Sequence, residues 1–219
     1  MKKLACIILL ILPMIGEAKI WTVDNTPGSG ADSGSLQGLI DVKASNGDTV
    51  ILMPSHIGYG SLNLYKRIFL YSRGHSNNNI DRDRSANVSS IYLGLSGGNS
   101  SAGSTIKGLR VSGGFNINVS NIHIQNCYVG GSNYVYQSNA LIEGCVFENL
   151  YYETPIYFTT SSNNNIIAHC YFTKRLTSGT VSGPQYSFVY LGNSSNLIIN
   201  NLYDYPFSYL FFPYQVSSI

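Results

Sequence analysis

Apolar and polar residues alternate with a period of two through much of the chain, which is the pattern of short β-strands buried on one face. In the segment 121–129, Ile122 and Ile124 fall on one face of such a strand. Asn126 interrupts the alternation, and the apolar positions resume at Cys127. The pattern therefore predicts a short strand, a one-residue corner and a second short strand.

Five stretches of the chain align in register on this unit. The first inward residue after the corner is Leu109, Cys127, Cys145, Cys170 and Leu202. Three residues earlier stand Ile106, Ile124, Ile142, Ile167 and Ile199. The corner is Gly108, Asn126, Gly144, His169 and Asn201, and these residue types adopt a positive φ more readily than others. The reference positions are 18, 18, 25 and 32 residues apart, and such a variable repeat is typical of a solenoid.

Successive coils of this solenoid should stack as parallel strands about 4.8 Å apart, so that equivalent side chains lie on top of one another. Asparagines recur six residues before the reference position, at Asn121, Asn139, Asn164 and Asn196. We expect this column to form an amide ladder, as stacked parallel strands favour. The repeat thus predicts a parallel β-helix.

The units resemble the repeats of right-handed parallel β-helix proteins with the pectate-lyase-like architecture. Residues 21–32 (WTVDNTPGSGAD), 35–41 (SLQGLID) and 46–51 (NGDTVI) resemble the opening of secreted bacterial members, which supplies their N-terminal cap and first coil. The resemblance spans residues 20–210 and implies an all-β fold: a right-handed parallel β-helix with a short N-terminal cap helix. Because the family includes lyases, hydrolases and adhesins, the resemblance does not specify an activity.

The chain divides into three segments. Residues 1–18 have the charged, apolar and small-x-small regions of a secretory signal peptide, and their apolar run is too short for a comfortable membrane span. Residues 19–48 are the predicted cap, with a helix that begins after Ser33 or Ser35 and shields the unpaired strand edges of the first coil. The apolar stripe of this helix is Leu36, Leu39 and Ile40. Residues 49–219 form the β-helix, which ends either in an aromatic C-terminal cap or at a truncation.

Composition agrees with a secreted all-β protein. Charged residues make up 11% of the 219 residues, the net charge is +2 and there are 17 tyrosines. A nucleic-acid-binding protein normally carries a basic stripe, so we predict no nucleic-acid partner. We expect an extracellular or cell-surface monomer with no membrane span after signal removal.

The mature segment carries an odd number of cysteines, Cys127, Cys145 and Cys170, in one inward column. Adjacent coils bring their Cα atoms within disulfide range, so one bridged pair is an alternative. Stacked side chains are rarely aimed at one another, and we therefore favour buried thiols that pack as small apolar residues.

Conventional catalytic chemistry is not visible in the sequence. A lyase of this fold would need a calcium site, and calcium takes six to eight oxygen ligands. We predict no cofactor and no metal. The alternative is a calcium site at Glu143 and Glu148, with Glu153 in the following loop. A hydrolase would need paired carboxylates, and the Gly-His-Gly and Arg-Ile-Lys motifs of polygalacturonases are missing. We predict no catalytic residue.

Tyrosines are the most promising binding residues. Two directly follow reference cysteines and should face outward on one side, and four lie in connecting loops; the set is Tyr128 and Tyr171, with Tyr134, Tyr136, Tyr151 and Tyr152. A ring with an apolar face and a hydroxyl suits a sugar or a protein partner. The competing interpretation is that these tyrosines merely cover a β surface, where their propensity is high.

Three hypotheses for function follow. The first is a non-catalytic secreted or cell-surface protein that binds a polysaccharide or another surface component. The second is a polysaccharide lyase or glycoside hydrolase acting on uronate-containing polysaccharide. The third is a fragment of a larger surface protein without independent activity.

Overall fold

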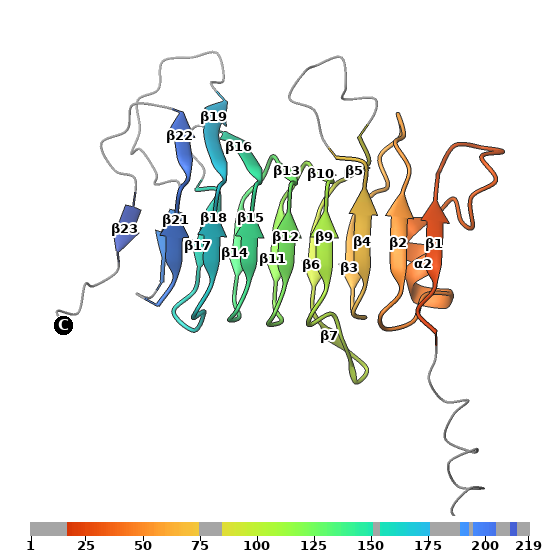
Figure 1. The fold of residues 1–219 in the computed structure, drawn as a ribbon, viewed down its shortest axis with the longest axis horizontal. Coiled ribbons are helices and arrows are strands. Elements are labelled where there is room, and N and C mark those ends of the chain that lie inside the picture. The colour runs from red at the N-terminus through yellow and green to blue at the C-terminus, as the bar shows by residue number, and fades with distance from the viewer. Residues whose placement is uncertain are drawn as a thin grey trace, which may run out of the picture.

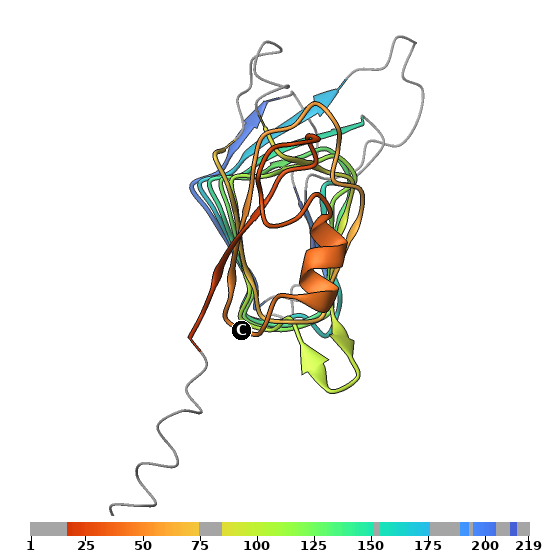
Figure 2. The ribbon, with the colours of Figure 1, turned by 90° about the vertical axis from the view of Figure 1, so that its right-hand side faces the viewer.

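The computed structural model describes residues 17–74, 85–150, 154–175, 189–192, 195–204 and 211–213. These residues form a stack of coils, seen from the side in Figure 1 and end-on in Figure 2. Each complete coil contributes one strand to each of three sheets, which we name A, C and B in the order in which the chain visits them.

The strands of sheet A are β1 (Ile20–Val23), β2 (Thr49–Leu52), β4 (Phe69–Ser72), β9 (Thr105–Lys107), β12 (His123–Gln125), β15 (Leu141–Glu143), β18 (Ile166–Ala168) and β21 (Leu197–Ile199). The strands of sheet C are β5 (Asn87–Val88), β10 (Arg110–Val111), β13 (Tyr128–Val129), β16 (Val146–Leu150), β19 (Tyr171–Arg175) and β22 (Leu202–Asp204). The strands of sheet B are β3 (Leu62–Leu64), β6 (Ile91–Leu93), β11 (Phe115–Ile117), β14 (Asn133–Val135), β17 (Ile156–Phe158), β20 (Val189–Leu191) and β23 (Phe211–Pro213). Pairing within all three sheets is parallel, for example β12 with β9 and β15. The predicted parallel β-helix is confirmed.

Sheet B was not anticipated from the sequence, and it changes the coil from two strands to three. A second difference lies in the Gly- and Ser-rich segment 97–103, whose composition predicts a flexible loop. It contains part of an antiparallel hairpin of β7 (Leu95–Ser96) and β8 (Asn99–Ser100). This hairpin projects from the coil below sheet B in Figure 1.

The interior is filled by columns of identical or similar side chains. Ile106, Ile124, Ile142 and Ile167 stack in register on the inner side of sheet A, and all are buried. Each coil can bury this apolar surface only against the next coil, so the core is continuous along the helix axis.

The corners between sheets A and C have the predicted left-handed backbone in four units. Gly108, Asn126, Gly144 and His169 have φ values of 73°, 51°, 60° and 54°. At Gly144 a Cβ atom would also stand 2.4 Å from the Asn126 side-chain oxygen. These positions therefore require a residue that tolerates a positive φ, and at Gly144 the Asn126 side chain would also have to shift to admit a Cβ atom.

The asparagines of this column form a left-handed backbone corner and not an amide ladder. Asn121, Asn139 and Asn164 have φ values of 61°, 63° and 55°, and they make the corner between sheets B and A. Their backbone N–H groups donate to the carbonyls of Ser138, Asn163 and Ser195 in the next coil. No side-chain hydrogen bond joins these three asparagines within the described part of the chain, so the ladder prediction is wrong for them. An amide pair does occur one position along, where Asn165 Nδ2 donates to Asn196 Oδ1 at 2.9 Å.

The fifth predicted unit is displaced by one residue. Ile167 pairs with Ile198, not Ile199, and Cys170 therefore stacks on Asn201. The left-handed corner is Asn200, with φ of 50°. Because side chains alternate along a strand, this one-residue shift exchanges the inward-facing and outward-facing side chains of the unit. Leu202 is 66% exposed, and Asp204 faces outward and not inward.

Counted from Leu202, the repeat predicts an inward Asp204, but Tyr203 takes that position, in register with Phe172. Its ring stacks on Phe172 with centroids 5.1 Å apart, and Phe172 stacks on Phe147 at 4.9 Å. An inner aromatic column thus continues through the last described coil of sheet C.

The N-terminal cap is built around helix α2 (Leu36–Val42). Ser35 is the N-cap, and its Oγ accepts a hydrogen bond from the Gly38 N–H at 3.1 Å. The predicted stripe of Leu36, Leu39 and Ile40 is buried. In Figure 2 the helix lies beside the wall of the coil at its N-terminal end.

The described residues include no helix that is long and apolar enough to cross a bilayer. The predicted signal peptide falls mostly on residues 1–16, which lie outside the described residues.

Candidate functional site

The outer face of sheet B carries a row of tyrosines, one above another in successive coils. The pairing register places six residues in a single column: Asn63, Tyr92, Asn116, Tyr134, Tyr157 and Tyr190. We call Tyr92, Tyr134, Tyr157 and Tyr190 the tyrosine column. Each stands at the centre of a three-residue strand whose flanking residues face the core, so the strand pleat itself points the rings outward.

The rings of the column are packed against one another. Tyr134 and Tyr157 are stacked with centroids 5.0 Å apart and planes within 10° of parallel. Tyr190 continues the row at 6.0 Å from Tyr157 in a tilted arrangement. Tyr136 lies beside the column, 6.3 Å from Tyr134. Such contacts stabilise aromatic pairs by about 0.5–1.5 kcal/mol beyond area burial.

Tyr92 is held in a different way. Its ring lies along its own strand over Gly94, where a Cβ atom would stand only 2.2 Å from Tyr92 Cε1. Tyr65 packs edge-on against the ring, with centroids 5.9 Å apart and an interplanar angle of 60°. Gly94 and Tyr65 therefore fix the position of Tyr92.

The column is interrupted once, at Asn116, and a hollow of about 200 Å³ lies there. We call this hollow the slot. Tyr92 and Tyr134 line it on the strands either side of Asn116, and Ser90, Ser132 and Gly114 also line it. The position between two ring-bearing strands thus carries a short carboxamide where an aromatic ring would otherwise continue the row.

Two of the predicted binding tyrosines lie in this site. Tyr134 is 39% exposed and stands in strand β14, not in a connecting loop as expected. Tyr136 follows the same strand directly. The sequence offered a signal for the remaining tyrosines, because Tyr92, Tyr157 and Tyr190 each stand between two apolar residues in a short alternating stretch.

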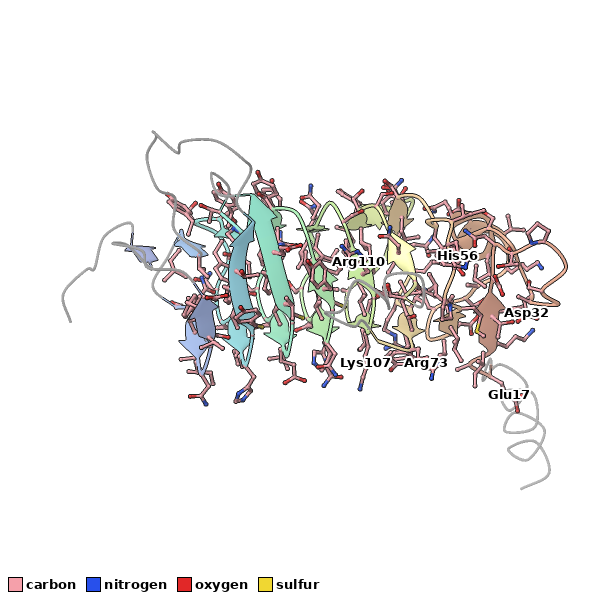
Figure 3. All side chains as sticks on the ribbon, turned by 90° about the horizontal axis from the view of Figure 1, so that it is seen from above. Glu17, Asp32, His56, Arg73, Lys107 and Arg110 are labelled. Carbon is pink, nitrogen blue, oxygen red and sulfur yellow. The ribbon has the colours of Figure 1, made fainter. Side chains whose placement is uncertain are left out.

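Tyr128 and Tyr171 share the outer column of sheet C, as predicted, with Val146 between them. Tyr128 is only 8% exposed. The Arg110 guanidinium lies 4.4 Å from its ring centroid, and its hydroxyl donates to Glu148. Arg110 is labelled near the middle of the molecule in Figure 3. Tyr128 is therefore covered by its own neighbours.

Tyr171 donates a hydrogen bond from its hydroxyl to Asp204 Oδ2 at 2.5 Å. The hydrogen bond to this carboxylate raises the pKa of the Tyr171 phenol above its ordinary value of 10.0. The hydroxyl is thus held in its protonated, donating form. Tyr151 and Tyr152 lie outside the described residues.

The carboxylates considered for calcium have separate partners. Glu143 Oε1 accepts from Gln125 Nε2 at 2.8 Å and lies 2.9 Å from His123 Nε2, on the outer face of sheet A. Glu148 lies on sheet C, where it accepts from Tyr128. Glu153 lies outside the described residues. Among the residues with described positions, no group of three metal-binding side chains comes together.

Cys127, Cys145 and Cys170 stack inside the coil as free, buried thiols, which confirms the interpretation we favoured. Each sulfur lies near the isoleucine carbonyl of the preceding coil, as in the 3.7 Å contact from Cys145 Sγ to Ile124 O. Burial, together with the neighbouring thiols, raises the pKa of Cys145 well above its ordinary value of 9.0. All three side chains are buried, and they pack as small apolar residues in the core.

Comparisons with known proteins found no matching family model, no matching curated protein and no matching solved structure. The three interleaved parallel sheets place the chain among the parallel β-helix solenoids, and no narrower family is identified.

Proposed function

We propose that this chain is a secreted or cell-surface protein of the right-handed, pectate-lyase-like type, and that it binds glycan without cleaving it through the outer face of sheet B. The observation that carries the proposal is the tyrosine column with the slot in it. Aromatic rings that present an apolar face and a hydroxyl match the alternating C–H and O–H groups of a sugar. The column crosses successive coils, so it offers an extended surface to an extended ligand.

The chemistry of the face favours binding over catalysis. Asn and Ser side chains accompany the tyrosines at the slot, and these groups hydrogen-bond without titrating near neutral pH. Glycoside hydrolysis by the usual route needs two carboxyl groups across one bond. The slot is lined by neither Asp nor Glu. The signal-like segment 1–18 supports export of the chain to a place where polysaccharides occur.

The proposal is tested with purified residues 19–219 and a panel of insoluble neutral and uronate-containing polysaccharides. We expect co-sedimentation with at least one of them and no new reducing ends. The variant Tyr134→Ala removes the most exposed ring of the column and should reduce retention tenfold or more. Tyr71→Ala is the matched control, because Tyr71 lies on the outer face of sheet A, and it should bind as the wild type does.

Two results would contradict the proposal. Release of new chain ends would establish an enzyme and favour the lyase or hydrolase alternative. Equal losses in the Tyr134 and Tyr71 variants would show that sheet B is not the binding face.

A further inference from the structure

We infer that the slot at Asn116 binds one uncharged sugar ring, inserted between Tyr92 and Tyr134 in the place of a missing aromatic ring. This inference rests on the proposed glycan-binding function and names the ligand class and the subsite. It follows from the spacing of the column, from the polar groups at the slot and from the charge of its lining.

The spacing of the column sets the width of the slot. Strands β6 and β14 pair with opposite sides of β11, so Tyr92 and Tyr134 are two strand steps apart, or about 9.6 Å. The nearly parallel stack of Tyr134 on Tyr157 shows how one ring fills one step. A single ring above Asn116 would extend that stack by one member, with its face against Tyr134.

The volume limits the ligand to one ring at this point. Pockets for drug-sized ligands hold about 300–1,000 Å³, and the slot holds about 200 Å³. A terminal residue or a single-residue branch enters such a hollow, whereas a linear chain lying flat does not. Gly114 borders the slot with backbone alone.

The polar groups at the slot suit hydroxyl groups. The Asn116 carboxamide, which lines the slot, has a donor and an acceptor; its Oδ1 accepts from Asn118 Nδ2 at 3.5 Å, and its Nδ2 can donate to a ligand hydroxyl. Ser90 Oγ donates to Ser61 Oγ at 2.9 Å and keeps its own lone pairs for a ligand hydroxyl. Ser132 adds a second hydroxyl at the same margin.

The charge of the lining selects against uronic acids. Ser, Ile, Tyr, Gly, Phe and Asn residues make up the slot, and there is neither lysine nor arginine among them. A uronate carboxylate would lose part of its hydration there without gaining a cationic partner, which costs free energy. Lys107 and Arg73, labelled in Figure 3, belong to the sheet A side of the coil and are not lining residues. The slot therefore favours a neutral hexose ring.

The decisive variant is Asn116→Tyr, which completes the row of rings and fills the slot. Because it adds a stacked aromatic on an outer face, we expect unchanged or raised thermal stability together with at least a tenfold loss of binding. Asn63→Tyr is the matched control. It introduces the same residue in the same column, on the far side of Tyr92 and outside the slot, and it should bind as the wild type does.

The probes are two pairs of β-1,4-linked hexasaccharides that differ only in oxidation at C6: mannose with mannuronate, and glucose with glucuronate. Isothermal titration with residues 19–219 should show the neutral member of at least one pair binding tenfold or more tightly than its uronate. If Asn116→Tyr does not fold, Asn116→Leu keeps the size of the side chain and removes its hydrogen bonds, and it should also lose affinity.

The two proposals fail in distinguishable ways. Wild-type affinity in Asn116→Tyr, with binding lost in Tyr134→Ala, would overturn the slot and leave glycan binding at sheet B intact. Tighter binding of the uronate member would overturn the neutral-ring specificity. Absence of binding to every polysaccharide and oligosaccharide would overturn both proposals.

Discussion

Asp48 joins the first strand to the loop before the second. Its side chain is buried, and its carboxylate accepts hydrogen bonds from the Lys19 N–H and Trp21 Nε1, both at 2.8 Å, and from the Ser45 N–H at 2.9 Å. Burial opposes the charge on this carboxylate. The three hydrogen bonds outweigh burial and hold the pKa of Asp48 below its ordinary value of 3.8.

We predict that Asp48→Asn destabilises the fold by about 1.5–3 kcal/mol near neutral pH, because hydrogen bonds to a charged group are lost. The folded pKa of Asp48 is depressed, so its stabilising contribution is complete above the unfolded pKa and disappears as the pH falls through the folded pKa. Urea unfolding from about pH 7 to about pH 2 should therefore show the wild type and the variant converging at the acid end. Asp24→Asn, which keeps the oxygen that accepts from the Thr26 N–H, is the control; a pH-independent difference for Asp48→Asn would contradict the prediction.

Individual residues also show which parts of the repeat register the sequence could not determine. A positive φ was expected at Gly, Asn and His corners, and four of the five corners were placed correctly. In the fifth, Asn200 and Asn201 are adjacent and either fits the pattern, and Ile198 and Ile199 are equally ambiguous. Only the pairing of Ile167 with Ile198 resolves the register. Local composition carried no information that distinguished the two alignments.

At the scale of one element, helix α2 does more than cover apolar surface. The side-chain amide of Gln37 pairs with the exposed edge of β3: its Nε2 donates to the Asn63 carbonyl at 3.1 Å, and its Oε1 accepts from the Asn63 N–H at 2.8 Å. One carboxamide thus imitates the hydrogen bonds of a neighbouring strand. Lys66 Nζ secures the end of the helix by donating to the carbonyls of Ile40 and Ala44. Unpaired edges promote aggregation, and this one is blocked.

We predict that Gln37→Ala lowers stability by about 1–2 kcal/mol, the usual contribution of one or two neutral hydrogen bonds. It should also increase association on mild heating, because the N–H and C=O groups of Asn63 become available to another chain. Static light scattering during a temperature ramp measures this association. Val42→Ala, at a helix position that is 82% exposed, should behave as the wild type does. Unchanged scattering for Gln37→Ala would show that the edge is protected by other means.

The helix is the element that the sequence specified best. Its start at Ser35 and its buried stripe follow from a cap residue and a 3.6-residue period that lie within a few positions of one another. The strands of sheet B are the opposite case. They stand at no constant distance from the reference positions, because the linkers between sheets C and B vary in length. The tyrosine column was therefore not predicted as a column, although Tyr134, which belongs to it, and Tyr136, which lies beside it, were predicted as binding residues.

For the molecule as a whole, stability is transmitted from coil to coil. Each strand of sheets A, B and C pairs with its neighbours in the adjacent coils, and the inner aromatic column of Phe147, Phe172 and Tyr203 joins three consecutive coils. In such a quasi-one-dimensional protein, stability is approximately a sum of coil terms and nearest-neighbour terms. Damage should accordingly remain local until the loss exceeds what the neighbouring coils supply.

We predict that Phe172→Ala costs about 3–5 kcal/mol, as is usual for removing a buried aromatic side chain. Hydrogen exchange followed by mass spectrometry should show lost protection in strands β16 to β22, while β2 and β4 keep theirs. Phe115→Ala, in a coil nearer the N-terminus, should shift the loss of protection to its own coil and the adjacent ones. Uniform loss of protection along the whole chain in either variant would indicate one cooperative unit.

The connections on the two sides of sheet C differ in how much their lengths vary from coil to coil. Two residues separate the sheet A strand from the sheet C strand in each of the last five coils, and one of these two residues has a left-handed backbone conformation. Between sheets C and B the linkers contain 2, 3, 3, 5, 13 and 6 residues in successive coils. Loop length costs little free energy once a loop exists, so insertions accumulate at the second corner without disturbing the core. This corner borders the face that carries the tyrosine column, and new recognition loops can therefore be grafted or evolve next to the binding surface while the folding unit stays the same.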